Sequence, residues 1–427
     1  SAPAIARDLD ALSRGVDALG ARAYPPQSAV YDSLQGAAFD AAALIAACPA
    51  REGDLVRVSE RLRDAVKAQS RRWDPSSAEA RARLYTLLYG TRAAVEAVMV
   101  RAHDGAFALV AGSDAPSATP AAAVRGVTVH SGDLLLSRGG YPTSALIARG
   151  SDFPGEFSHV ALVHVDSATH AVSVVEAHIE RGVAVSTVEQ YLGDAKLRIL
   201  LLRPRADLPA LVRDPMLPHR AAGDMLARAR REHIPYDFTM DQRDPEALFC
   251  SEVASAAYGG RGVGLWPGLS TISAPGLRRW LAEFGVTHFE TEEPSDLEYD
   301  PQLVVVAEWR DPSALLRGQI DDAVVDAMLE RANAGWDIPY KWWQLPLARL
   351  AKGWSAVLNA FGKVGPVPEG MSASGALRQK AFMRVQRETV ARVTALANDV
   401  RARTGAPPPY WVLLALARAS VDAPVSP

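Results

Sequence analysis

Three residue types in this chain could together hydrolyse an acyl bond: a cysteine, a histidine and an acid. Cys250 follows the apolar segment 247–249 and precedes a Ser-Glu pair and a run of small residues. This pattern predicts that Cys250 begins a buried helix, with Glu252 in its first turn. Unpaired N–H groups and the helix dipole would lower the pKa of a thiol there, and the thiolate is the nucleophile. We therefore expect Cys250 to be the nucleophile of a hydrolase.

A thiol that attacks a carbonyl needs a base and a polar group that holds the base in place. His159 begins the apolar segment 159–165, and Glu176 lies near the end of the next such segment, 170–177. The turn residues 166–169 between them predict a hairpin. In an antiparallel hairpin the start of one strand lies beside the end of the next, which would place Glu176 next to His159.

Other histidines near this hairpin have weaker claims to a role. His178 is two residues beyond Glu176, so it shares that face of the strand and is an alternative orienting residue. His164 lies five positions after His159, on the opposite face, and is expected to be structural. The cluster that these residues form with His170 could hold a metal, but a thiol site explains His159 with fewer assumptions. We expect no metal and no cofactor.

The elements that must position these residues form an α+β arrangement. Further strands are predicted at 132–138, 182–188, 197–203 and 303–309, and a helix at 218–232. Short strands in succession without helices between them predict an antiparallel sheet. Apolar residues at helical spacing predict helices on either side of this region. We therefore expect a helical segment at 1–119, a catalytic domain at 120–311 and a helical segment at 312–427. Packing of the two helical segments as one auxiliary domain is one alternative.

Composition sets limits on function. The chain has 427 residues, 48% hydrophobic and 22% charged, as expected for a folded protein of two or three domains. The net charge of −3 means that the overall charge of the chain does not favour binding to nucleic acid or to an anionic membrane. No apolar run is long enough to span a bilayer. Motifs typical of zinc peptidases, thiol redox proteins, nucleotide-binding loops and serine hydrolase elbows are missing from the sequence.

Two further features bear on the thiol and on the compartment. The second cysteine, Cys48, follows an alanine-rich segment, and we interpret it as a buried apolar residue. A disulfide between Cys48 and Cys250 would abolish the nucleophile and is not expected. The opening Ser-Ala-Pro-Ala is compatible with signal-peptide cleavage, so a periplasmic or exported protein is favoured over a cytoplasmic one.

Four motifs in a fixed order resemble those of a known family. They are Gly132-Asp-Leu134, Phe157-Ser-His-Val-Ala161, Val174-Val-Glu-Ala177 and Tyr236-Asp237 with Phe249-Cys-Ser-Glu252. Together they are similar to the YiiX/YaeF-type permuted papain-fold amidases, which are relatives of the NlpC-type cell-wall peptidases. In ordinary papain-like enzymes the cysteine precedes the histidine, whereas here the histidine comes first, as in the permuted group. The resemblance covers roughly residues 124 to 310.

The resemblance implies a permuted papain-like (NlpC-like) core, with Cys250 as nucleophile, His159 as base and Glu176 as orienting residue. It also implies that Tyr236, Asp237 and Ser158 line the substrate cleft, with Tyr236 a candidate donor to the oxyanion. An alternative for Tyr236 and Asp237 is a turn with a packed tyrosine. The backbone N–H of Cys250 is the other candidate oxyanion donor.

We therefore expect a cysteine hydrolase that cleaves an amide bond in a cell-wall peptide or an N-acylated small molecule. A first alternative is an acyl-lipid hydrolase or acyltransferase, given the kinship of the permuted group with lecithin:retinol acyltransferase-like enzymes. An apolar tunnel beside Cys250 would favour that alternative, and a short polar cleft would favour a peptide. A second alternative is a non-catalytic binding module. The expected partners are a small-molecule, peptide or lipid substrate and no nucleic acid.

Overall fold

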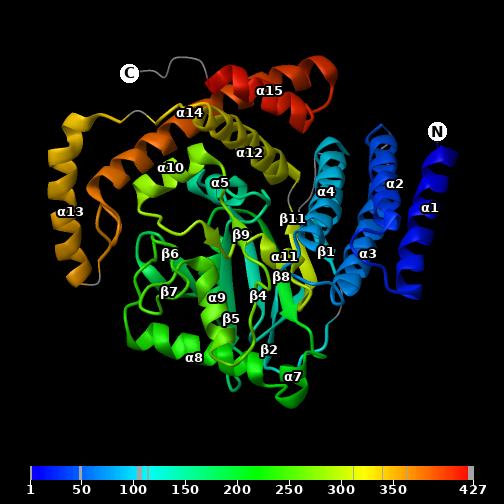
Figure 1. The fold of residues 1–427 in the computed structure, drawn as a ribbon, viewed down its shortest axis with the longest axis horizontal. Helices are drawn as coiled ribbons and strands as arrows, with labels where there is room; N and C mark the ends of the chain where they lie inside the picture. The colour runs from blue at the N-terminus through cyan, green and yellow to red at the C-terminus, as the bar shows by residue number, and fades with distance from the viewer. Residues whose placement is uncertain are drawn as a thin grey trace.

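A computed structural model describes residues 2–47, 51–102, 108–112, 115–310, 312–338, 340–361 and 363–421. Cys48 lies outside these residues. The chain forms a central antiparallel sheet with helices on both faces and at one end (Figure 1). Among the described residues, no helix is both long and apolar enough to cross a bilayer.

The central sheet has seven strands in the order β1-β11-β8-β4-β5-β6-β7, and each neighbouring pair is antiparallel. The strands are β1 (Ala108–Ala111), β4 (Leu134–Gly139), β5 (His159–Val165), β6 (Val172–His178), β7 (Gly182–Thr187), β8 (Lys196–Pro204) and β11 (Leu303–Arg310). Two-stranded pairs are formed by β2 (Ala121–Val124) with β3 (Val127–His130) and by β9 (Ser270–Thr271) with β10 (Glu290–Thr291).

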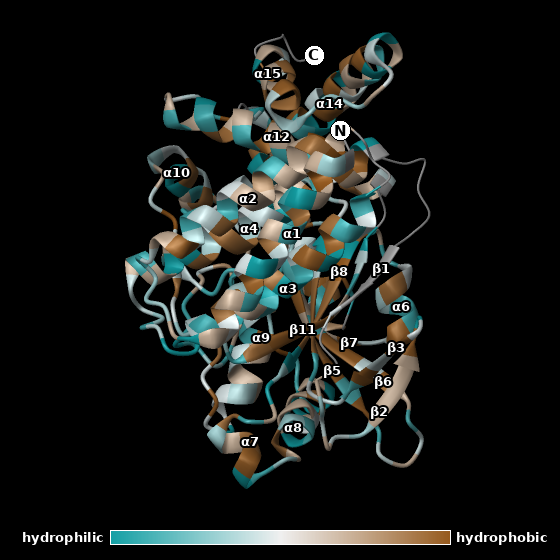
Figure 2. Ribbon diagram, turned by 90° about the vertical axis from the view of Figure 1, so that its right-hand side faces the viewer, coloured by the Kyte–Doolittle hydropathy of each residue, from teal (hydrophilic) through white to brown (hydrophobic). Residues whose placement is uncertain are grey.

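Both faces of the sheet are buried, which is why its strands are nearly continuous apolar runs (Figure 2). One face, which includes Val160 and Leu162, packs on α8 (Leu217–Arg231) and α9 (Cys250–Gly259). The opposite face, which includes Ala161 and Val163, is covered by Tyr191 of α6 (Val188–Gly193) and by β2 and β3. Short helices α7 (Pro209–Arg213) and α11 (Asp296–Tyr299) complete this region.

Helices at the two ends of the chain pack on the sheet domain. The N-terminal bundle consists of α1 (Ala2–Ala21), α2 (Ala29–Ala46), α3 (Glu52–Ser70) and α4 (Ala78–Ala102). The C-terminal helices are α12 (Pro312–Asn333), the short 3₁₀ helix η2 (Trp342–Gln344), α13 (Leu345–Ala360), α14 (Ala373–Thr404) and α15 (Tyr410–Val421). They share an apolar core with α5 (Pro142–Arg149) and α10 (Pro275–Phe284). The two ends meet where Leu315 of α12 enters the core of the N-terminal bundle.

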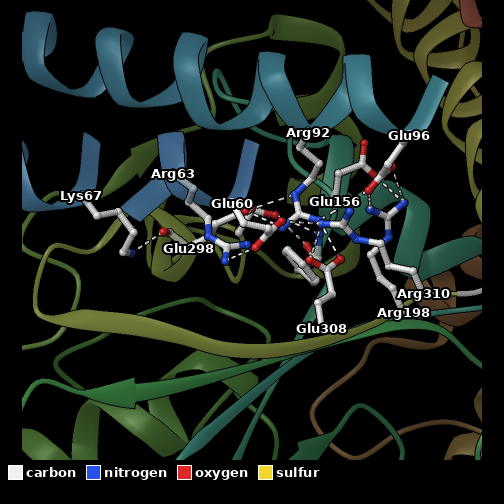
Figure 3. Close-up of polar contacts among 12 residues, drawn as sticks. Glu60, Arg63, Lys67, Arg92, Glu96, Glu156, Arg198, Glu298, Glu308 and Arg310 are labelled. Carbon is white, nitrogen blue, oxygen red and sulfur yellow. Dashed lines mark hydrogen bonds and ion pairs between the residues drawn. The ribbon is translucent and has the colours of Figure 1, made fainter. Parts of the chain in front are cut away.

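A buried ion-pair network joins the N-terminal bundle to the sheet (Figure 3). Arg92 of α4 binds Glu298 of α11 and Glu308 of β11, and Glu96 of α4 binds Arg198 of β8. Lys67 of α3 donates to the backbone carbonyl of Asp300 at 2.8 Å. These ion pairs join elements that are distant in sequence. Buried charged side chains of the bundle are therefore neutralised by partners in the sheet domain, and the reverse.

Several local predictions are confirmed. The strand expected at 159–165 is β5. The strands expected at 197–203 and 303–309 are β8 and β11, and their bounds agree with the prediction within one residue at each end. The turn at 166–169 forms because the Asp166 side chain accepts hydrogen bonds from the backbone N–H groups of Ala168 and Thr169. The α+β fold with an antiparallel sheet between helical ends is also as expected.

Candidate active site

Cys250 is the first residue of α9, as the sequence predicts. The helix begins here because Glu252 reaches back and accepts the Phe249 N–H at 2.8 Å. The thiol is buried, with 4% of the residue exposed, and lies against the start of β5. The thiol donates to the carbonyl oxygen of Ser158 at 4.0 Å, and the backbone N–H of Val160 lowers the pKa of the thiol. The nucleophile candidate therefore touches the residues on either side of His159.

His159 is held by Glu176, as the hairpin argument predicts. Its Nε2 lies 2.8 Å from Oε2 of Glu176. Strand register places Glu176 opposite Ala161, so the acid is a diagonal neighbour of His159 on the same face. An ionised carboxylate only accepts hydrogen bonds, so Nε2 carries the proton and Nδ1 of the neutral ring is the basic nitrogen.

The other oxygen of Glu176 is also occupied. Ser186 Oγ donates to Oε1 at 3.1 Å, and His178 Nε2 lies 3.4 Å from it. Burial alone would raise the pKa of Glu176, but the hydrogen bonds from His159 and His178 hold that pKa well below its ordinary value. His178 therefore supports the acid that orients His159. The sequence did not identify Ser186, which comes from the next strand.

Burial also influences the protonation of the candidate base His159 and the candidate nucleophile Cys250. It lowers the pKa of His159, and Glu176 only partly opposes this, so the ring is neutral near pH 7. Burial raises the pKa of the Cys250 thiol to about 12. The N–H of Val160 favours the thiolate, but the nearby acid Glu293 disfavours it. The N–H of Ser251 at the helix start also favours the thiolate, but burial outweighs it. The prediction that the thiol has a lowered pKa is therefore wrong for this conformation.

Cys250 and His159 line one cavity of about 440 Å³. Among the described residues, no hydrogen bond joins the thiol to the His159 ring. Proton transfer from Sγ to Nδ1 would therefore require the two groups to approach further. The structure brings the three residues to one end of the sheet with the thiol in its neutral form.

Tyr236 and Asp237 lie in the loop between α8 and α9, close to the thiol. Val183 N–H donates to the carbonyl of Ile234 at 2.9 Å, and Gly182, with φ of +70°, leaves room for that carbonyl. Tyr236 lines the cavities beside Cys250, and burial raises its pKa well above the ordinary value. Asp237 instead holds the loop, because it accepts from the N–H groups of Thr239 and Asp241, each at 2.7 Å.

Ser158 combines a contact with the thiol and a role in the loop. Its carbonyl lies beside Cys250, and its N–H donates to the carbonyl of Ser137 at 2.9 Å. Its hydroxyl accepts weakly from Gly139 N–H at 3.4 Å. The residue lines the 440 Å³ cavity, so its backbone positions the thiol while its side chain is near the cleft.

Two cavities meet at Cys250. The larger one includes four charged side chains in its lining, Glu180, Arg181, Asp194 and Lys196. The second, of about 140 Å³, is lined mostly by apolar side chains. The wall residues come from α5, the loop that carries Tyr236, α10, α14 and the segment just before α14. They include Leu146, Phe238, Leu277, Leu281, Phe284, Met371 and Phe382. The contribution of α14 carries no local signal in the sequence, because it depends on how the C-terminal helices fold back.

Buried acids border the apolar cavity near the thiol. Burial raises the pKa of Glu292 to about 7 and that of Glu293 to about 8. Glu252, which caps α9, has its pKa raised to about 8 by burial and by the neighbouring acids Asp237 and Glu292. Of the two acids that line the cavity, Glu293 is therefore mostly uncharged near pH 7 and Glu292 is about half ionised. An uncharged carboxyl costs less to bury beside an apolar ligand than a carboxylate does.

An antiparallel sheet with a cysteine on the packed helix and a histidine on a central strand defines a papain-like fold, here with the histidine first in sequence. Residues 128–306 match the family model described as "Permuted papain-like amidase enzyme, YaeF/YiiX, C92 family". This segment is therefore a permuted papain-like amidase domain, and the protein is a cysteine hydrolase of amidase or peptidase type. Comparisons of the chain with curated proteins and with solved structures gave no match.

Proposed function

We propose that Cys250, His159 and Glu176 hydrolyse an amide through an acyl-enzyme. The observation that supports this most directly is the 2.8 Å contact between His159 Nε2 and Glu176, beside a thiol that lines the same cavity. Glu176 fixes the ring so that Nδ1 is the nitrogen available to accept a proton. The amidase class of the domain supports the same assignment.

In the proposed reaction, the thiol proton passes to His159 Nδ1 as the sulfur attacks the amide carbonyl. The carbon–sulfur bond forms, and the carbonyl electrons move to the oxygen. The backbone N–H of Cys250 is the candidate donor to this oxyanion, because the first N–H of a helix has no intrahelical acceptor. The oxyanion electrons then re-form the carbonyl, the carbon–nitrogen bond breaks, and His159 gives its proton to the leaving amine, which leaves a thioester on Cys250. Water attacks the thioester, with His159 again as base, and releases the acid.

The two cavities support an N-acylated substrate over a cell-wall peptide. An apolar acyl group matches the 140 Å³ cavity, and a polar amine portion matches the cleft that holds Arg181 and Lys196. The apolar cavity also favours a second candidate, hydrolysis of an acyl-lipid ester at the same thiol. Both candidates place the acyl carbonyl at Cys250.

The test uses fluorogenic amides and matched esters with acyl chains of increasing length. The intact protein should release the fluorophore, and Cys250→Ala should reduce the rate to background while the melting temperature stays similar. Mass spectrometry of the intact protein should detect an acyl adduct on Cys250. Undiminished turnover by Cys250→Ala would contradict the proposal. Faster cleavage of esters than of amides at every chain length would favour the second candidate.

A further inference from the structure

The helix α13 exposes a continuous apolar stripe. Leu347, Leu350, Trp354 and Val357 recur at spacings of three and four, so they share one face of the helix. Trp343 before them and Phe361 after them continue the same spacing. Leu350 is 72% exposed and Phe361 77%. More than half of the large hydrophobic side chains that the described residues expose lie between 342 and 364.

The stripe is not the face by which α13 packs on the protein. Ala348 and Ser355 are buried on the side toward α14, and Ser355 Oγ accepts the Val367 N–H at 2.9 Å. Figure 1 shows α13 at the edge of the molecule, beside α14 and away from the sheet. The packed side of the helix thus uses small residues, while its largest side chains face solvent.

The segment that carries the stripe is cationic. Between residues 338 and 368 there is no acidic residue, whereas Lys341, Arg349, Lys352 and Lys363 give four positive charges in a chain of net charge −3. All four are exposed, and among the described residues none forms an ion pair. The positive charge is therefore local and free to meet an external anion.

We propose that residues 342–364 bind the surface of an anionic lipid bilayer, with α13 lying in the plane of the membrane. An exposed helix with tryptophan, phenylalanine and leucine on one face and only cations among its charges is typical of interfacial binding. Its 16 residues give a length of about 24 Å, and no acid repels the headgroups. A second copy of this chain is a poorer occupant, because a two-fold contact would bring like charges from both copies together.

This surface is independent of the proposed hydrolysis but lies close to it in the chain. The segment leads into α14, where Gln379 lines both cavities at Cys250 and Met371, just before the helix, lines the apolar one. A bilayer on α13 would thus hold amphiphilic substrates near the domain that cleaves them.

The test is sedimentation of the full chain with vesicles. The protein should co-sediment with vesicles of equimolar phosphatidylglycerol and phosphatidylcholine, and less with phosphatidylcholine alone. Leu350→Glu/Trp354→Glu should weaken binding at least about tenfold, and Trp411→Glu, at another exposed tryptophan of 72% exposure, should not. Arg349→Gln/Lys352→Gln should weaken binding to anionic vesicles on the order of tenfold. The matched control is Arg14→Gln/Arg72→Gln, at two exposed arginines near the N-terminal bundle.

Several outcomes would overturn the membrane assignment. One is the absence of sedimentation with either vesicle type. Another is binding that the stripe variant leaves unchanged. A third is a wild-type dimer that Leu350→Glu/Trp354→Glu dissociates, without any vesicle binding, since that would assign the stripe to a second copy. Each variant is accompanied by its melting temperature, so loss of folding is separated from loss of binding.

Discussion

At the scale of single residues, the site is organised around a carboxylate whose two oxygens are both occupied. Glu176 contacts His159 through one oxygen, and Ser186 and His178 through the other. Because both oxygens have partners, the orientation of the carboxylate is fixed, and with it the orientation of the imidazole that it contacts. The charge of Glu176 also raises the pKa of His159 against the effect of burial. The acid thus has a geometric role and an electrostatic role, which a substitution can separate.

Glu176→Gln keeps the shape of the side chain and removes the charge. We expect kcat to fall on the order of 10²- to 10⁴-fold, because the imidazolium formed in the reaction loses its counter-charge. The pKa of His159 should fall further, so the acidic limb of the pH–rate profile should move to lower pH. Ser186→Ala is the control, because it leaves the charge in place and should cost much less activity. An unshifted profile and a full rate in Glu176→Gln would contradict this role.

Glu292 predicts a pH dependence of stability. Its pKa is raised by burial from 4.5 to about 7, so the folded state binds the proton more tightly than the unfolded state. Stability from this group is fully present below pH 4.5 and declines as pH rises through about 7. This difference in pKa corresponds to a loss of at most about 3 kcal/mol in the free energy of unfolding. Glu292→Gln should therefore stabilise the protein at pH 8 in urea unfolding and change little at pH 4. Equal effects at both pH values would contradict this.

At the scale of elements, local sequence signals predicted the parts of the site that lie within one or two neighbouring elements. Cys250 at the start of α9 and the hairpin that joins His159 to Glu176 depend on an N-terminal cap and a turn, which short segments encode. The apolar cavity and the raised pKa of the thiol depend on long-range packing. Residues such as Phe382 of α14 reach the cavity only because α14 folds back over α10. No short pattern encodes that contact.

The apolar cavity between α10 and α14 predicts a dependence on acyl length. Leu281→Trp on α10 should fill part of this cavity, because Leu281 lines it and is only partly buried. We expect kcat/KM to fall at least about tenfold for long acyl chains and to stay similar for an acetyl amide. Leu269→Trp, at an exposed leucine that does not line the cavity, is the control. A uniform loss for every chain length in Leu281→Trp would argue against an acyl pocket.

At the scale of the whole molecule, the catalytic sheet is enclosed by helices from both ends of the chain. Ion pairs attach both sets of helices to the sheet domain. Arg92 of α4 binds residues of α11 and β11, and Arg149 of α5 binds Asp326 of α12 at 2.9 Å. Such pairs are costly to bury, so their stabilising effect depends on every member being present. The N-terminal bundle is therefore expected to unfold together with the catalytic domain.

Arg92→Met tests this coupling. Arg92 is 3% exposed in its side chain and binds Glu298, Glu308 and Glu96. Its loss would remove one cation from each of these buried acids, although Glu308 keeps Arg310 and Glu96 keeps Arg198. Arg310 and Arg92 together lower the pKa of Glu308 against the effect of burial. We expect a loss of about 3–5 kcal/mol in the free energy of unfolding. Arg61→Met, at an exposed pair with Asp17, should cost less than about 1 kcal/mol. If urea unfolding showed equal losses for the two variants, the buried network would not be what fastens the bundle to the sheet.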